Sequence, residues 1–144
     1  MSDAAPIRRI LNERDHGFAA AVVVPLGARS MIFISGEVGR DGAGHLVACS
    51  FETETRQLFA NLELALQRAG AEFKDVVRIT AYVKDLADYP VYAQIRNEIF
   101  RSEWPASASV GVSDLLLGAR IEIDAVAVVS SEPSALSDVA AAQP

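Results

Sequence analysis

The sequence has few of the residues that build disulfide frameworks, metal sites and catalytic triads. It contains one cysteine, Cys49, and two histidines, His16 and His45, in 144 residues. A single cysteine excludes a disulfide network within the chain and a cysteine-based zinc site. Two histidines are a poor supply for a histidine-rich metal site or a Ser-His-Asp triad. The glycine-rich residues 39–44 lack the lysine and the strand-to-helix context of a phosphate-binding loop.

Positive charge and long apolar runs are also scarce. The net charge is −6, which argues against a protein that binds the backbone of a nucleic acid. No apolar run approaches the roughly 18 residues of a membrane span. Residues 1–9 are not followed by the apolar stretch of a signal peptide, so we expect a cytoplasmic protein. From the charge and the missing apolar run we expect no nucleic-acid partner and no membrane partner.

The composition is that of a globular domain. Hydrophobic residues make up 51% of the chain and charged residues 22%. The length suits one domain with a substantial core, which we place at residues 1–129. Residues 130–144 are small, polar and without pattern, and we expect them to form a disordered tail.

Hydrophobic periodicity predicts eight secondary-structure elements. A three-to-four-residue repeat of apolar side chains predicts a helix over residues 51–69, with Ser50 as its cap and Gly70 at its end. A second helix follows Pro90 and extends to Ile99. Alternating or continuous apolar runs predict strands at residues 7–12, 19–26, 31–35, 75–84, 107–112 and 120–129.

The predicted order is therefore β-β-β-α-β-α-β-β. This order indicates an α+β protein, in which one mixed sheet carries two helices packed on one face. The strands are apolar enough to need cover on both faces. We expect self-association to cover the second face, with a closed symmetric oligomer as the default form.

One strand carries an unusual row of charges. Within residues 120–129, Ile121 and Ile123 belong to an apolar face, and Arg120, Glu122 and Asp124 fall on the other face. Such a face either meets water or lines a site. Glu122 lies in the strand and is the main candidate for chemistry. The plain alternative is a solvent-facing glutamate, or one that pairs with Arg120.

Several segments together resemble the RidA (YjgF) family, over about residues 17–129. The segments are Ile34-Ser35-Gly36, the helix with Gln57, Asn61-Leu62, Leu66 and Ala69-Gly70, Asp75-Val76-Val77, Tyr82-Val83-Lys84-Asp85-Leu86, Trp104-Pro105-Ala106, and Ile121-Glu122-Ile123-Asp124-Ala125-Val126-Ala127. The resemblance implies a chorismate-mutase-like (YjgF-like) fold and a homotrimer with a cleft at each subunit interface. It also implies hydrolysis of reactive enamines and imines, such as 2-aminoacrylate, to a keto acid and ammonia without a cofactor. In that scheme an arginine after the Pro-Ala pair binds the substrate carboxylate, and the strand glutamate serves the attacking water.

The residues that the resemblance places in the site are only partly retained. Glu122 falls on the family glutamate, and Ser35 and Gly36 fall on its Ser-Gly pair. Four other positions differ from the family: Phe18 replaces a tyrosine, Ala93 an asparagine, Ser109 a frequent cysteine and Ser107 the carboxylate-binding arginine. Loss of that arginine removes a charge-assisted contact, so a divergent member with altered specificity is expected.

Three functions remain open at this point. The first is an enzyme with Glu122 as acid/base, Ser35, Gly36, Ser107 and Ser109 as substrate contacts, and Phe18 as an apolar wall. The second is a ligand-binding or interaction protein that kept the trimer and lost the chemistry. The third is a ribonuclease, against which the acidic charge balance and the two turn-located histidines argue. Ser107 and Ser109 are otherwise ordinary polar residues on one face of a strand.

Overall fold

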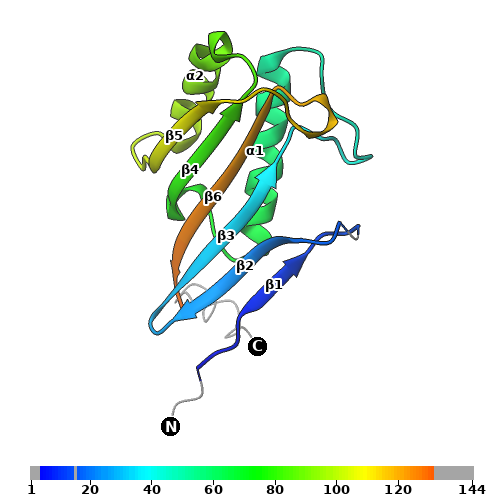
Figure 1. Ribbon diagram of the computed structural model, residues 1–144. Coiled ribbons are helices and arrows are strands. Elements are labelled where there is room, and N and C mark those ends of the chain that lie inside the picture. The colour runs from blue at the N-terminus through cyan, green and yellow to red at the C-terminus, as the bar shows by residue number, and fades with distance from the viewer. Residues whose placement is uncertain (1–3, 15, 132–144) are drawn as a thin grey trace, which may run out of the picture.

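The computed structural model describes residues 4–14 and 16–131 (Figure 1). The order of strands and helices agrees with the predicted one. The elements are β1 (Arg8–Leu11), β2 (Ala19–Leu26), β3 (Arg29–Glu37), α1 (Phe51–Arg68), β4 (Val76–Val83), α2 (Tyr89–Phe100), β5 (Ala106–Gly111) and β6 (Ile121–Ser130). Their boundaries lie within about two residues of the predicted ones at most ends. Residues 132–144, most of the expected tail, lie outside the described residues.

The strands form one mixed sheet in the order β1-β2-β3-β6-β4-β5. All neighbouring pairs are antiparallel except β4 and β5, which are parallel and are connected through α2. The last strand, β6, lies between β3 and β4 and so joins the hairpin half of the sheet to the helical half (Figure 1). This central position holds Glu122 between two strands.

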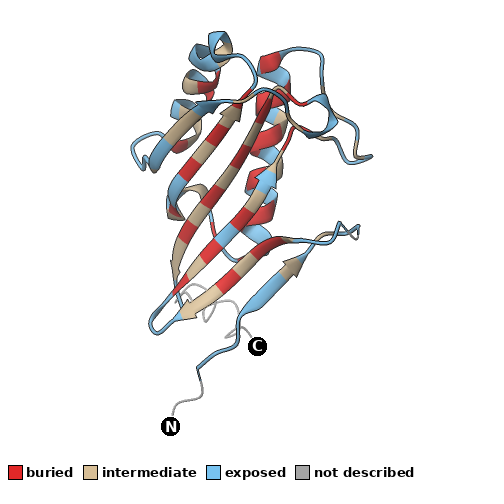
Figure 2. Ribbon diagram, in the orientation of Figure 1, coloured by how far each residue is buried: buried red, intermediate tan, exposed pale blue. Residues whose placement is uncertain are grey.

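Both helices lie behind the sheet in the view of Figure 1, and the main core lies between them and the strands. Every second residue of β6, from Ile121 to Ala127, is buried against this layer, as the banding of Figure 2 shows. From the helices, Leu58, Leu62, Tyr92 and Ile95 complete the core at 1% exposure or less. The predicted cap of α1 is confirmed, because the Ser50 hydroxyl accepts a hydrogen bond of 3.0 Å from the Thr53 backbone N–H.

The other face of the sheet has no covering layer in the described chain, and its side chains divide into two regions. Cross-strand neighbours Val22, Phe33 and Val126 form an apolar row over β2, β3 and β6. Toward β4 the same face carries Thr80 and Tyr82 with the two β6 carboxylates. Phe33 is 45% exposed. Self-association over this face stays a prediction, since one chain is described.

Among the described residues, neither helix combines the length and the apolar character that a membrane span requires.

Candidate functional site

Glu122 projects from β6 onto the open face of the sheet, because its neighbours Ile121 and Ile123 are buried on the helix side. It is half-buried between Tyr82 of β4, its cross-strand neighbour, and Gly36 of β3. Its carboxylate makes no hydrogen bond and no ion pair with another described residue. A strand carboxylate with free acceptor oxygens is suited to bind a water or a substrate proton.

Gly36 is a glycine because Glu122 packs directly against it. A Cβ atom built on Gly36 would lie 2.7 Å from Glu122 Oε1 and 3.0 Å from Glu122 Cδ. The β3–β6 register shifts between Ile34 and Glu37, so a bulge shapes the strand at this point. Gly36 and Glu122 therefore lie in direct contact, and their roles in a site stay a prediction.

The surroundings of Glu122 favour its protonated form. Burial raises the pKa of Glu122 above its ordinary value, and the negative charge of Asp124 raises it further. Asp124 itself accepts a hydrogen bond of 3.0 Å from the Tyr82 hydroxyl. This bond raises the pKa of Tyr82 and fixes the Asp124 carboxylate two residues away from Glu122.

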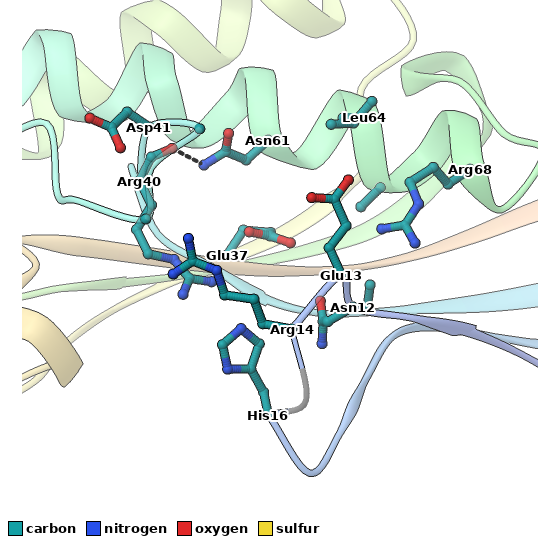
Figure 3. Close-up of a pocket in the computed structure, with 14 residues that line it drawn as sticks. Asn12, Glu13, Arg14, His16, Glu37, Arg40, Asp41, Asn61, Leu64 and Arg68 are labelled. Atoms are coloured by element: carbon teal, nitrogen blue, oxygen red, sulfur yellow. Dashed lines mark hydrogen bonds between the residues drawn. The ribbon is translucent and has the colours of Figure 1, made fainter.

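A second carboxyl with a raised pKa is that of Glu37. It lines a polar cavity, which Figure 3 shows. Burial raises the pKa of Glu37, the charge of Arg40 lowers it, and the charge of Glu122 raises it again. The cavity has a volume of about 220 Å³ and includes Arg14, Arg40 and Arg68 in its lining. Two of these arginines also bind backbone: Arg14 donates to Ala43 O at 3.2 Å, and Arg68 donates to Leu11 O. The sequence did not point to this cavity, because its lining comes from segments far apart in the chain.

Ser35 and Phe18 lie at the neighbouring β2–β3 part of the sheet. The Ser35 hydroxyl donates to the backbone carbonyl of Ala19 at 2.6 Å, so it ties β3 to β2. Phe18 is 54% exposed and stacks on His16, with ring centroids 5.8 Å apart. An exposed aromatic ring is compatible with the predicted apolar wall, which stays a prediction.

Ser107 and Ser109 do not meet Glu122 within one chain. Their register partners on the parallel strand β4 are Ile79 and Ala81, which are buried on the helix side of the sheet. Residues opposite one another in paired strands share a face, so the two serines face the helix layer while Glu122 faces away from it. The predicted site residues thus fall into two groups on opposite faces of the sheet.

Arg120 is not part of the charged face that its position in the sequence suggested. Its Nε donates to Glu54 Oε2 at 2.7 Å, and its backbone N–H donates to Glu54 Oε1 at 2.7 Å. Glu54 belongs to α1 and is fully buried. The alternative of an ion pair between Arg120 and Glu122 is therefore wrong, because Arg120 pairs with Glu54.

The part of the chain that the structure describes contains no cluster of three or more His, Cys, Asp or Glu side chains arranged to hold a metal ion. Cys49 is exposed in the loop before α1.

The sheet order, the two helices on one face and the half-buried strand glutamate define a YjgF-like α+β protein. The chain belongs to the Endoribonuclease L-PSP family, the family of RidA and YjgF, whose model matches residues 15–129. The structural resemblance to RidA predicted from the sequence is thereby confirmed.

Two of the similar proteins are named as deaminases. A human protein named 2-iminobutanoate/2-iminopropanoate deaminase is 38% identical over 98 residues, which are 67% of this chain and 72% of the relative. A protein of the same name from Dermatophagoides farinae is 29% identical over 68% of this chain and 77% of the relative. Both relatives therefore carry the name of an imine deaminase.

Solved structures agree on the fold. The crystal structure of a protein described as a putative endoribonuclease from Thermotoga maritima matches with a TM-score of 0.78 at 27% identity, over 86% of this chain and 98% of that one. A Rid-family protein of unknown function from Yersinia pestis matches with a TM-score of 0.78 at 24% identity, over 86% of this chain and 100% of that one.

Proposed function

We propose that this protein hydrolyses the imine or enamine of a small carbonyl compound, without a cofactor, and that Glu122 moves the protons. The observation that carries the proposal is the Glu122 carboxyl, which is half-buried and free of partners among the described residues, with a raised pKa. Membership of a family whose relatives are named imine deaminases supports the same chemistry. The exposed net negative charge continues to argue against RNA as the substrate.

The reaction consumes one water, and both protons of that water end on the nitrogen. Water attacks the carbon of the C=N bond while the Glu122 carboxylate accepts one proton from it and passes this proton to the nitrogen, which gives a carbinolamine. Glu122 then accepts the proton of the carbinolamine hydroxyl and delivers it to the nitrogen, and the C–N bond breaks to release the carbonyl compound and ammonia. One carboxyl can act as base and then as acid here, and a raised pKa makes Glu122 a stronger base than an ordinary glutamate.

The complete site requires a second copy of the chain. Glu122 and Gly36 lie on the open face of the sheet, whereas Ser107 and Ser109 face the helix layer. The apolar row of Val22, Phe33 and Val126 offers a surface for another subunit. We therefore place the reaction in a cleft between subunits of a homotrimer, with a small-molecule substrate, Phe18 as an apolar wall and the Ser107 region supplied by the neighbour.

The second candidate function is binding without catalysis. Ser107, Phe18 and Ala93 stand where the family has an arginine, a tyrosine and an asparagine, and these changes favour it. An assay of the purified protein decides between the two functions. Imines generated in the assay by an amino-acid oxidase are expected to disappear faster when the purified protein is present than when it is left out. The protein should prefer substrates other than 2-aminoacrylate. No acceleration over a panel of aliphatic and aromatic imines would reject the enzyme and leave the binding protein.

The Gly36→Ala variant is expected to lose about tenfold or more of that turnover while remaining stable. The new methyl group would overlap Glu122 Oε1, and the flexible glutamate would move aside by about 1 Å, a shift large enough to disturb catalysis. Initial rates and a thermal melt measure the two effects. Gly42→Ala is the matched control, since a Cβ at Gly42 meets no atom within 4 Å. Equal losses in both variants would refute the role of the Gly36–Glu122 contact.

The pH dependence of the reaction is expected to report Glu122. Its carboxylate acts only when deprotonated, so the rate falls as the pH drops through the pKa, and the raised pKa places this fall above the range of an ordinary glutamate. Asp124→Asn removes the nearby negative charge and keeps an acceptor for Tyr82. The acid limb of the profile of kcat/KM should then move to lower pH. An unmoved or upward-shifted limb would show that another group controls it.

A further inference from the structure

A second cavity, separate from the one around Glu37, opens between the end of α2 and the start of β5. It has a volume of about 330 Å³ and is lined by Arg96, Asn97, Phe100, Trp104, Pro105 and Ser107. One cation, one hydroxyl and two aromatic rings thus surround a space large enough for a small organic molecule. We refer to it as the Trp104 cavity.

Arg96 brings a positive charge that no described carboxylate neutralises. Its guanidinium carbon lies 5.4 Å from the ring centroid of Tyr92, one turn earlier on α2. The nearby acid Glu98 is already engaged by Arg56 at 3.0 Å and by Gln94 at 3.3 Å. Within the described residues, Arg96 forms neither an ion pair nor a hydrogen bond. Its five N–H donors are therefore available to an anion.

Close to Arg96 lies a buried hydroxyl that has no hydrogen-bond partner among the described residues, that of Tyr92. The residue is 0% exposed, and its ring stacks on Phe59 with centroids 6.3 Å apart, so the hydroxyl has a fixed position. Burial raises the pKa of Tyr92, while the approach of Arg96 and Ser107 lowers it. Neither approach has hydrogen-bond geometry. Burying such a donor without a partner costs about 1–3 kcal/mol, which a small movement of the neighbouring Ser107 hydroxyl toward it would recover.

Trp104 supplies an apolar surface at the same place. Its side chain is 72% exposed, an unusual state for an indole, and Phe100 lies behind the cavity with 3% exposure. An exposed indole beside a guanidinium that has no ion pair is suited to a ligand with an anionic end and an apolar body.

We propose that the Trp104 cavity binds the carboxylate of a small acid with a bulky apolar or aromatic side chain. The Arg96 guanidinium and the Ser107 hydroxyl donate to the carboxylate, and Trp104 covers the apolar body. The buried Tyr92 hydroxyl lies outside the cavity lining and, after that small movement, donates to Ser107 from beneath it. Arg96 thereby provides, from α2, the positive charge that Ser107 does not. Binding is independent of the proposed hydrolysis. The further step, that the ligand is a 2-imino acid substrate, rests on the proposed function.

Trp104 is the only tryptophan of the chain, so its fluorescence reports on this cavity directly. The probes are phenylacetate and its neutral isostere phenylacetamide, titrated against the full-length protein with excitation of the indole. Phenylacetate is expected to change the emission saturably and to bind about tenfold or more tightly than the amide. Arg96→Gln should remove that preference, whereas Arg8→Gln, which makes the same charge change on β1, should retain it. Equal affinity for acid and amide, no saturable change, or an unchanged preference in Arg96→Gln would overturn the proposal.

Tyr92→Phe separates ligand binding from a purely structural role. Removal of a buried unpartnered hydroxyl should leave the melting temperature equal or higher, while the affinity for phenylacetate falls about threefold or more. A lower melting temperature with unchanged affinity would assign the hydroxyl to the core instead.

Turnover distinguishes the two proposals: hydrolysis without phenylacetate binding would reject the cavity assignment alone, and binding without hydrolysis would reject the proposed enzyme alone.

Discussion

Replacement of Glu122 by glutamine is expected to lower kcat for imine hydrolysis about 10²–10⁴-fold, the range that a positioned acid/base residue contributes. Glutamine has the same shape and can still contact Gly36, but it can neither accept the proton of the attacking water nor return one to nitrogen. KM should change less than kcat, because the lost interaction operates in the transition state. Rates with imines produced by an amino-acid oxidase measure the effect.

The stability of Glu122→Gln should match that of the unmodified protein within about 0.5 kcal/mol. Glu122 makes no hydrogen bond or ion pair with a described residue, and its charge lies beside that of Asp124, so its loss removes no attraction. Asp124→Asn is the matched control on the same face of β6 and should keep most of the maximal rate. Unchanged turnover in Glu122→Gln would assign the chemistry to another group, and Glu37→Gln would then be the next variant to assay.

The fold could be predicted largely from local patterns. Alternation of apolar residues in β6 and the three-to-four-residue repeat of α1 specify element types, because each pattern matches one periodicity and one buried layer. Ser50 marks the start of α1 for a similar reason, since its hydroxyl replaces a missing backbone partner. The position of β6 between β3 and β4 comes from the structure, because local pattern carries no information on which strands become neighbours.

The candidate site was less predictable than the fold. It depends on which face of the sheet each side chain points to, and alternation alone does not decide this. Alternation places Ser107 and Ser109 on one face of β5, but only the parallel pairing with β4 shows that this is the helix face. Arg120 stands directly before β6, where a long side chain is free to turn toward α1. The unpaired Tyr92 hydroxyl could not be predicted either, because a tyrosine at an apolar position of a helix is common and its sequence context does not show whether its hydroxyl has a partner.

The buried pair of Glu54 and Arg120 leads to the largest expected effect on stability. Glu54→Ala should lower the free energy of unfolding by about 2–4 kcal/mol. The range for breaking one partner of a buried ion pair is about 3–5 kcal/mol, and it is reduced here because the Arg120 side chain is 34% exposed and regains some water. The variant also leaves the Arg120 backbone N–H without its acceptor at the start of β6. For a domain of this size the melting temperature should fall by about 5–12 °C.

Glu52→Ala is the control for Glu54→Ala, because it removes a carboxylate from the same first turn of α1. Glu52 pairs with Arg56 in solvent, with side-chain exposures of 59% and 45%, so its loss should cost no more than about 0.5 kcal/mol. Gly39 explains why the two glutamates differ: a Cβ there would lie 2.3 Å from the Glu54 backbone oxygen, so the loop before α1 packs tightly over Glu54 and excludes water. Chemical denaturation of both variants tests this, and equal midpoints would show that the buried pair contributes no more than a surface one. Arg120 precedes Glu122 by two residues, so Glu54→Ala should also lower turnover, even when the assay temperature is well below the melting temperature of the variant. Glu52→Ala should leave turnover unchanged.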